Sequence, residues 1–334
     1  MTLASATADA EQVESAPVGR GTALVDRVLD ASIFLSLVVL VVVFSLLSPE
    51  FLTVDNLLNI LDASAIVGIV AVGVTIALIG GHFDLSIGSI VGLSSSVLAL
   101  TLTDWGVPAL PAIGLAIVAA LLIGVVNGIL VVEFGINSII ATLGMLAAVR
   151  GLAFVVSSGK PIPVENDFLT SLGTSQPLGI PISVYIMAVA YAGAWVLLTQ
   201  TRLGLHIYAV GGDPVAAERA GIRHNQVTRL LFLATALCAA IGAVLMTARN
   251  FSGQAVFGRD LEFDVLTAVL LGGIGLRGGE GSVVRTLVGV AIVGVITNGL
   301  VLTEVPPYWT DVARGGVLIL AVVLEAIRER RGRR

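Results

Sequence analysis

Long apolar runs separated by short polar stretches dominate the chain. Because a bilayer core requires about 20 apolar residues per helix, this pattern predicts an all-α fold, a polytopic membrane bundle of about ten transmembrane helices. The ten runs lie at 31–48, 57–80, 85–102, 109–132, 136–157, 182–200, 227–248, 263–276, 283–302 and 310–327. The eighth is short and rich in glycine, so we expect a re-entrant or broken element there.

Composition and charge support a membrane protein and predict its orientation. The chain is 56% hydrophobic and 12% charged, with a mean hydropathy of +1.01, whereas about a quarter of a soluble domain is charged. If the first run starts inside, thirteen of the 18 Lys and Arg residues lie on the inner side. Lys160, Arg249 and Arg259 then lie outside, and Arg150 and Arg314 lie within runs. The positive-inside rule therefore predicts that both termini are cytoplasmic.

The chain is predicted to have three parts. Residues 1–28 are largely polar and contain no signal-peptide apolar region, so they are expected to be a disordered cytoplasmic tail. Residues 29–327 form the transmembrane domain, and residues 328–334 form a basic cytoplasmic tail. The single Cys and the three scattered His residues have no metal-ligand spacing, so no metal site is predicted.

The sequence GGHFDLSIGS, residues 80–89, interrupts the apolar pattern between the second and third runs. The pair Gly80–Gly81 permits a break, Asp84 can cap the next helix, and Ser86 and Ser89 can add local hydrogen bonds. Polar backbone within a membrane must be satisfied by protein or line a cavity. Asp84 is therefore either a structural cap or part of a gate or substrate passage.

A second glycine-rich interruption occurs at residues 268–289, where a Gly pair again precedes a Gly-Ser and a new apolar run. Inverted repeats of transporters often carry such paired interruptions. The similarity favours two related halves, at about 57–157 and 227–327.

Several polar residues within or beside the runs are candidates for a translocation pathway. Arg150 lies deep in a run, where a cation costs about 2.5–3.5 kcal/mol on insertion scales. It either faces a polar interior or extends to the interface. Asn127, Asn137, Thr142 and Asn298 are neutral and can serve helix packing. A pathway for a hydroxyl-rich solute would use the same residue types.

A short helix is predicted on the cytoplasmic side, in the connection at residues 204–222. Asp213 is a preferred N-cap, Pro214 suits the first helical position, and Gly221 can end the helix in the left-handed conformation. Isolated helices of about two turns are marginal in water. The segment is either an ordinary surface connector or a helix that packs against a partner.

Three classes of membrane protein fit this pattern. An ion-coupled secondary transporter normally carries deep ionisable groups, but Asp62, Glu133 and Glu325 lie near the ends of runs. A membrane enzyme should gather acid, base or nucleophile at one depth, and no such group is visible. A permease driven by a separate ATPase needs a docking element and no phosphate loop. The sole lysine, Lys160, precedes Pro161 and forms no such loop.

Six motifs in order resemble the landmarks of ribose-type ABC importer permeases, the membrane subunits of carbohydrate uptake class 2 systems. The resemblance covers about residues 30–330. The motifs are GGHFDLSIGS (80–89), ATLGMLAAVRG (141–151), SSGKPI (157–162), YAVGGDPVAAERAGI (208–222), AVLLGGIGLRGGEGSV (268–283) and TNGL (297–300).

This resemblance implies a type II-like importer in the bacterial cytoplasmic membrane. Two permease subunits, homo- or heterodimeric, would enclose a central pathway. An extracytoplasmic solute-binding protein would deliver a small sugar-like substrate, and a cytoplasmic ABC ATPase dimer would bind ATP and Mg²⁺. This chain would bind no cofactor, catalyse no reaction and contact lipid but no nucleic acid. The residues that would form the coupling helix are Gly211, Gly212, Asp213, Pro214, Glu218, Arg219 and Gly221.

Two departures from the family pattern leave the substrate open. His82 and Phe83 stand where many relatives have one residue, and TNGL replaces the commoner Asn-Asn-Gly-Leu. Relatives carry pentoses, hexoses, sugar alcohols, autoinducer-2 and nucleosides. The sequence does not select among these solutes.

Overall fold

The computed structural model describes residues 20–332 and is almost entirely helical. The longer helices are α1 (Arg20–Leu47), α2 (Val54–Ile79), α3 (Ile87–Thr103), α4 (Ala109–Val132), α5 (Ser138–Val156), α7 (Ile182–Gln200), α10 (His224–Asn250), α12 (Val283–Leu302) and α13 (Pro307–Gly332). The shorter helices are α6 (Asp167–Thr174), α8 (Arg202–Gly212), α9 (Pro214–Arg219), α11 (Leu261–Leu271) and the 3-10 helix η1 (Pro177–Gly179). Strands β1 (Ile162–Pro163) and β2 (Ser252–Gly253) form an antiparallel pair.

The helices follow the apolar pattern of the sequence. Each of the ten runs coincides with one helix. Among the described residues, six helices are long and apolar enough to cross a membrane: α2, α4, α5, α7, α10 and α12. The eighth run forms only α11, whose 11 residues span about 16 Å, roughly half of a hydrocarbon core. The all-helical polytopic bundle is confirmed.

Helices extend into both of the segments predicted to be tails. Helix α1 already begins at Arg20, so the predicted disordered tail cannot extend to residue 28. The stretch before residue 31 contains apolar residues at helical spacing, which continue the first run without a turn signal. At the other end, α13 continues through Gly332. Residues 1–19 and 333–334 lie outside the described part.

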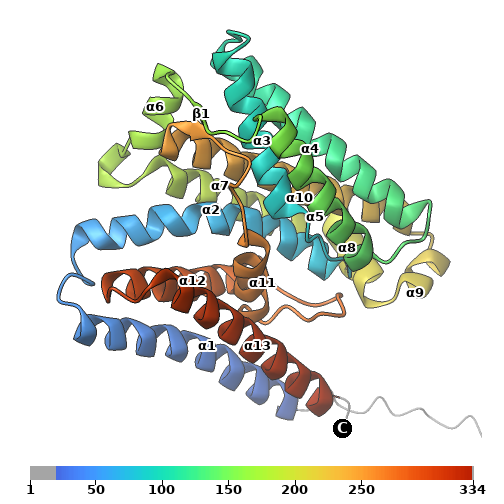
Figure 1. Cartoon of the computed structure of the whole chain (residues 1–334). Coiled ribbons are helices and arrows are strands. Elements are labelled where there is room, and N and C mark those ends of the chain that lie inside the picture. Colours follow the sequence, from blue (N-terminus) through green and yellow to red (C-terminus); the bar gives the residue numbers. More distant parts are fainter. Residues whose placement is uncertain (1–19, 333–334) are drawn as a thin grey trace, which may run out of the picture.

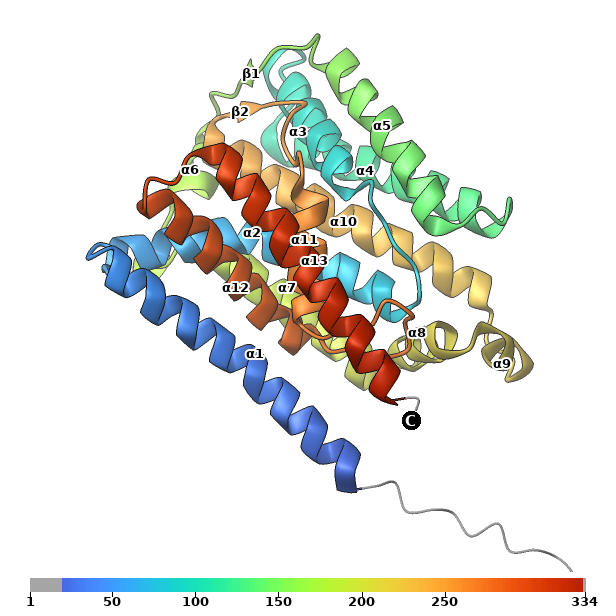
Figure 2. The ribbon, with the colours of Figure 1, turned by 60° about the horizontal axis from the view of Figure 1, so that its bottom comes forward.

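The bundle has two ends, here called the α6 end and the α9 end (Figures 1 and 2). At the α6 end, β1 pairs with β2, and the Thr103 hydroxyl donates to the carbonyl of Pro163 at 2.9 Å. At the α9 end, the N–H of Gly279 donates to the carbonyl of Ile79 at 2.7 Å. Helices α2 and α10 lie at the centre, whereas α4, α5 and α7 leave much of their apolar surface exposed, as expected for helices that face lipid.

One arrangement of elements occurs twice along the chain. A long helix is followed by a non-helical segment, a shorter helix and two further long helices, first as α2, α3, α4 and α5 and then as α10, α11, α12 and α13. We call residues 80–86 the first break and residues 251–260 the second break. The sequence pattern instead paired the first break with residues 268–289, which form the end of α11 and its turn into α12. Each break contains two glycines, but Gly80 and Gly81 are adjacent whereas Gly253 and Gly258 are separated, so the search for a glycine pair did not reveal the second break.

The second break extends deep into the bundle along α3. An added Cβ at Gly253 would lie 2.3 Å from the Cβ of Ala99, and one at Gly88 would lie 2.2 Å from the carbonyl oxygen of Gly258. From Ala99 to Gly88, α3 rises about 16 Å, which is half the thickness of a hydrocarbon core of about 30 Å. The non-helical chain therefore reaches the middle of the membrane before α11 begins.

Candidate coupling and translocation sites

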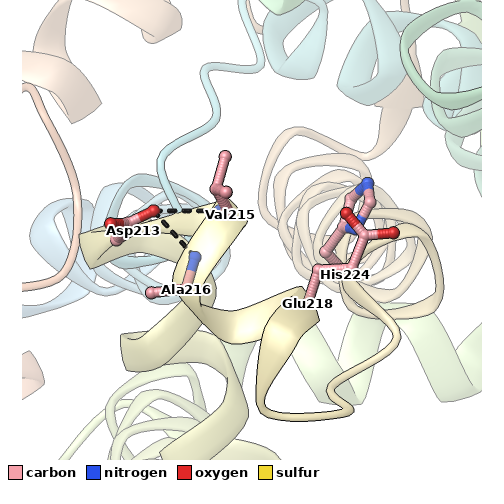
Figure 3. Close-up of polar contacts among 5 residues, drawn as sticks. All are labelled: Asp213, Val215, Ala216, Glu218 and His224. Carbon is pink, nitrogen blue, oxygen red and sulfur yellow. Dashed lines mark hydrogen bonds and ion pairs between the residues drawn. The ribbon is translucent and has the colours of Figure 1, made fainter.

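Helix α9 has the caps that the sequence predicts. Figure 3 shows the Asp213 carboxylate accepting hydrogen bonds from the backbone N–H of Val215 at 2.9 Å and of Ala216 at 3.0 Å. Pro214 is the first helical residue. Gly221 has φ +82°, the left-handed conformation that favours glycine at a helix C-terminus. The helical residues themselves are Pro214–Arg219, flanked by these two caps.

The outer surface of α9 is exposed and carries two charged side chains. Ala217 is 4% exposed and anchors the helix to the bundle, whereas Glu218 and Arg219 are exposed. The Glu218 carboxylate lies 3.8 Å from Nδ1 of His224, at the start of α10 (Figure 3). The helix thus presents a carboxylate and a guanidinium at the α9 end, where a partner could pair with both charges.

Gly211 and Gly212 are the last two residues of α8, and their surroundings differ sharply. An added Cβ at Gly211 would lie 1.9 Å from the carbonyl oxygen of Ile79, whereas one at Gly212 would find its nearest neighbour, the Cα of Gly279, at 3.9 Å. Gly279 donates its N–H to the same Ile79 carbonyl. We call this meeting of three backbones the glycine contact. It joins the helix before α9 to the end of α2 and to the turn after α11, and therefore to both halves of the repeat.

Four of the candidate pathway residues meet around the first break: Asp84, Ser86, Asn127 and Thr142. The Asp84 carboxylate accepts from the Ser86 hydroxyl at 2.6 Å and from the Thr235 hydroxyl at 2.5 Å. The Asn127 amide donates to the Ser86 hydroxyl at 2.9 Å. Asp84, Ser86, Asn127 and Thr235 are all buried. Ser86 occupies the N-cap position of α3, and the Asp84 carboxylate accepts from the backbone N–H of Ser86 at 3.0 Å.

Helix α5 satisfies the backbone of the first break. The Ser138 hydroxyl accepts from the N–H of Phe83 at 3.2 Å, and the Thr142 hydroxyl accepts from the N–H of Leu85 at 3.0 Å. Non-helical backbone at membrane depth requires such partners. These contacts support a structural role for Thr142, and the same holds for the buried Asp84 cluster.

Arg150, also on α5, supports the second break. Its Nη1 donates to the carbonyl oxygens of Ala255 at 2.5 Å and of Phe257 at 2.7 Å. The guanidinium therefore turns toward the interior and does not extend to the interface. The sequence located the polar residue correctly, but only the fold shows that it binds backbone carbonyls.

The remaining two candidates lie elsewhere. Asn137 is exposed and caps α5, because its side chain accepts from the N–H of Ile139 at 2.9 Å. Asn298 on α12 exchanges two hydrogen bonds with Asn56 on α2, at 3.0 and 2.8 Å. The candidate residues thus divide among the first break, the second break, a helix cap and the contact between α2 and α12.

A cavity with a volume of about 470 Å³ lies among α2, α10, α11, α12 and α13. Asn298 is the only candidate pathway residue that lines it. Sequence reasoning missed its other polar residues, Asn59, Ser64, Arg249, Arg259, Asp264, Thr297 and Arg314. A signal existed, since Arg249 and Arg259 oppose the positive-inside bias and Arg314 lies within an apolar run.

The cavity contains paired charges. Arg314 Nε lies 3.2 Å from an Asp264 carboxylate oxygen, and Arg249 Nε lies 3.1 Å from a carboxylate oxygen of Asp62. The TNGL departure falls here, because Thr297 lines the cavity. The other departure does not: His82 contacts the Thr228 hydroxyl at 3.2 Å. Among the residues that the structure describes, no three His, Cys, Asp or Glu side chains form a metal-binding group.

Comparison with known proteins agrees with this architecture. Residues 56–322 match the family described as branched-chain amino acid transport system / permease component. The chain is 37% identical to the ribose import permease protein of Escherichia coli (strain K12), over 87% of this chain and 92% of that protein. It is 37% identical to the ribose import permease protein of Bacillus subtilis (strain 168), over 87% and 91%. No solved structure matches.

A third relative widens the range of sugars. The L-arabinose ABC transporter permease protein of Azospirillum brasilense is 33% identical over 91% of this chain and 89% of its own length. The match to the family and the extent of these identities allow one conclusion. The chain belongs to the family of ribose-type ABC importer permeases, membrane components whose ATPase is a separate subunit.

Proposed function

We propose that this chain carries a monosaccharide, or a similar small polyhydroxylated solute, across the bacterial cytoplasmic membrane. Its relatives are described as permeases for ribose, L-arabinose and D-allose. The working unit contains two permease subunits, a cytoplasmic ABC ATPase dimer that holds ATP and Mg²⁺, and an extracytoplasmic solute-binding protein. Both termini and α9 face the cytoplasm.

The observation that carries this proposal is the placement of α9. The helix is capped at both ends, exposes Glu218 and Arg219, and follows α8, which ends in the glycine contact. A rigid element of this kind can receive a displacement from an ATPase. Because Gly211 touches the end of α2 without an intervening side chain, the displacement reaches the first break and α11 directly.

A direct test weakens α9 and leaves the bundle intact. Glu218→Arg reverses a charge on the exposed surface, and Gly221→Val forbids the left-handed cap at a typical cost of about 1 kcal/mol or more. The double variant should insert and dimerise at near-normal yield but lose ATPase binding or sugar uptake. Co-purification of the ATPase and radiolabelled uptake measure the two effects.

The chain offers a matched control at its α6 end. Asn166 caps α6 as Asp213 caps α9, accepting from the N–H of Phe168 at 3.1 Å and of Leu169 at 3.3 Å. Asn166→Ala should leave ATPase binding unchanged, whereas Asp213→Ala should reduce it. A double α9 variant that retains its ATPase and transports at the parental rate would reduce α9 to a connector.

An ion-coupled secondary transporter is the second candidate function. Proteoliposomes that contain this chain without the ATPase distinguish the two candidates. The proposal predicts no uptake and no ATP hydrolysis by the chain alone. Uptake that protonophores abolish would establish the secondary transporter. Competition by nucleosides, autoinducer-2 and branched-chain amino acids against labelled ribose in the complete importer tests the substrate class.

The orientation has its own test. In a Cys238→Ser background, a membrane-impermeant thiol reagent applied outside should modify Asp167→Cys on α6 and not Glu218→Cys on α9. The opposite labelling would reverse the proposed topology.

A further inference from the structure

We propose that the cavity beside the second break is the site where the permease itself binds its sugar. This inference rests on the proposed function. The site comprises Asp264 on α11, Arg314 on α13, Thr297 and Asn298 on α12, Ser64 on α2, and Arg259 in the second break, all of which line the cavity.

The first argument is the exposure of charged, non-helical chain at membrane depth. Arg259 and Asp260 are exposed, and so is the side chain of Phe263 in the first turn of α11. The neighbouring Gly258 lies against the start of α3, about 16 Å below Ala99 by helix rise. Irregular backbone and charges at this depth do not face lipid and are found where protein buries them or water fills a cavity. These residues are exposed in the single chain, so this surface faces either a water-filled path or the second permease subunit that encloses it.

The second argument is the chemistry of the lining. Each arginine in the cavity has an acidic neighbour: Arg314 pairs with Asp264, Arg249 pairs with Asp62, and Arg259 precedes Asp260 in the chain. Two of the three arginines in the lining are therefore neutralised by an ion pair. Carboxylates accept hydrogen bonds from hydroxyl groups, and guanidinium and amide groups donate to sugar oxygens. A neutral polyhydroxylated ring can use both kinds of group.

An unpaired hydroxyl also points to a ligand. Ser64 is 7% exposed and lines the cavity, yet its Oγ has no hydrogen-bond partner among the described residues. Buried polar groups are nearly always paired. The Oγ atom is itself buried, so a sugar hydroxyl or a water molecule in the cavity could supply the missing partner after a change of the Ser64 side-chain rotamer.

The position of the cavity agrees with a general property of membrane transporters. Substrate sites often lie near the midplane beside discontinuous helices, and here the N-terminal turn of α11 follows the second break. The volume of about 470 Å³ is within the usual range for small-molecule sites, about 300–1,000 Å³. Thr297, the residue at which TNGL departs from its family pattern, lies in this lining and is thus placed to affect substrate choice.

The experiment uses two cysteine variants on the same helix, each in a Cys238→Ser background and in the complete importer. Thr297→Cys lies in the cavity, whereas Thr286→Cys replaces a fully buried residue that bonds Thr75 at 2.9 Å. A small charged thiol reagent added outside should modify Thr297→Cys and not Thr286→Cys. Saturating D-ribose, with L-arabinose and D-allose tested in parallel, should slow modification of Thr297→Cys several-fold.

The outcomes are separable from those of the proposed function. If the parental importer takes up no sugar, the proposed function fails. If it takes up sugar but Thr297→Cys is unreactive, or is modified at the same rate with and without sugar, the site proposal alone fails.

A second variant tests whether the cavity recognises the sugar. Asp264→Asn keeps the size of the side chain but removes a charged acceptor, so uptake should fall on the order of tenfold. ATPase binding should be retained, because α9 is unchanged. The loss of uptake should differ among D-ribose, L-arabinose and D-allose, so the relative uptake rates of the three sugars should change. A purely structural role of Asp264 would instead lower all three rates equally. An equal reduction for all three sugars would contradict the assignment.

Discussion

The two breaks occupy equivalent positions in the repeat but differ in what surrounds them. The first break is enclosed: Asp84 and Ser86 are buried, and side chains from α4, α5 and α10 bond its polar groups or their neighbours. The second break is partly open, with Arg259 and Asp260 exposed. A membrane imposes the same requirement on both, since non-helical backbone must find partners. The first break meets this requirement within the protein, whereas the second break leaves the charges of Arg259 and Asp260 exposed, where they can face a pathway.

Helix α5 supports the two breaks by different chemistry. Ser138 and Thr142 accept from two backbone N–H groups of the first break, each through a neutral hydroxyl. Arg150 donates to two carbonyls of the second break through a single charged group. The support that α5 gives the first break is therefore shared by two residues, whereas its support of the second comes through Arg150. Ser95 on α3 also contacts the second break, accepting from the N–H of Gln254 at 3.2 Å.

The largest effect is expected from Arg150→Met. The substitution leaves the carbonyls of Ala255 and Phe257 without a donor, and each unpaired buried group costs about 1–3 kcal/mol. It also removes the charge that attracts the Glu262 carboxylate. Thermal unfolding in detergent should show a destabilisation of about 2–6 kcal/mol.

Arg150→Lys is the matched control for that prediction. It keeps the positive charge but not the planar donor group, so its stability should fall between those of the parent and Arg150→Met. If both variants are as stable as the parent, the second break does not depend on Arg150 and the contrast between the breaks is lost.

A smaller effect is expected from Gly211→Ala, which probes the link between α8 and the end of α2. The added methyl would meet the Ile79 carbonyl oxygen at 1.9 Å, and overpacking of this kind typically costs about 1–3 kcal/mol. Uptake should fall by more than the loss of stability explains, because the added methyl would separate α8 from the end of α2 at the glycine contact. Stability is measured by thermal unfolding and function by radiolabelled uptake.

The neighbouring glycine provides the comparison. Gly212→Ala would place its methyl 3.9 Å from the nearest atom, the Cα of Gly279, and should leave both stability and uptake near parental values. Equal behaviour of the Gly211 and Gly212 variants would show that close approach to Ile79 is unimportant.

The smallest effect is expected from Thr142→Val in the first break. The variant removes one neutral acceptor, so the N–H of Leu85 loses its partner at a cost of about 1 kcal/mol. Thr142→Ser keeps the hydroxyl and should recover most of that loss. Thermal unfolding distinguishes the two variants. A loss as large as that of Arg150→Met would mean that support of the first break is not distributed.

The part of the candidate site that is local in sequence was predictable. Asp213, Pro214 and Gly221 lie within one short segment, and each acts on backbone groups only a few residues away. Their roles as caps follow from side-chain chemistry and backbone conformation. The second break was not predictable in this way, because its partners on α3 and α5 are more than a hundred residues distant.

The sequence by itself determined the membrane class, the ten apolar helices and the capped α9, since these depend on hydrophobic length and local hydrogen bonds. Only the tertiary structure decided which polar residues meet. It placed Asp84, Ser86 and Asn127 in a closed cluster, and it gathered Asp264, Thr297 and Arg314 around a cavity. The physical reason is that burial and pairing of polar groups depend on contacts between distant helices, which residue spacing along one helix does not specify.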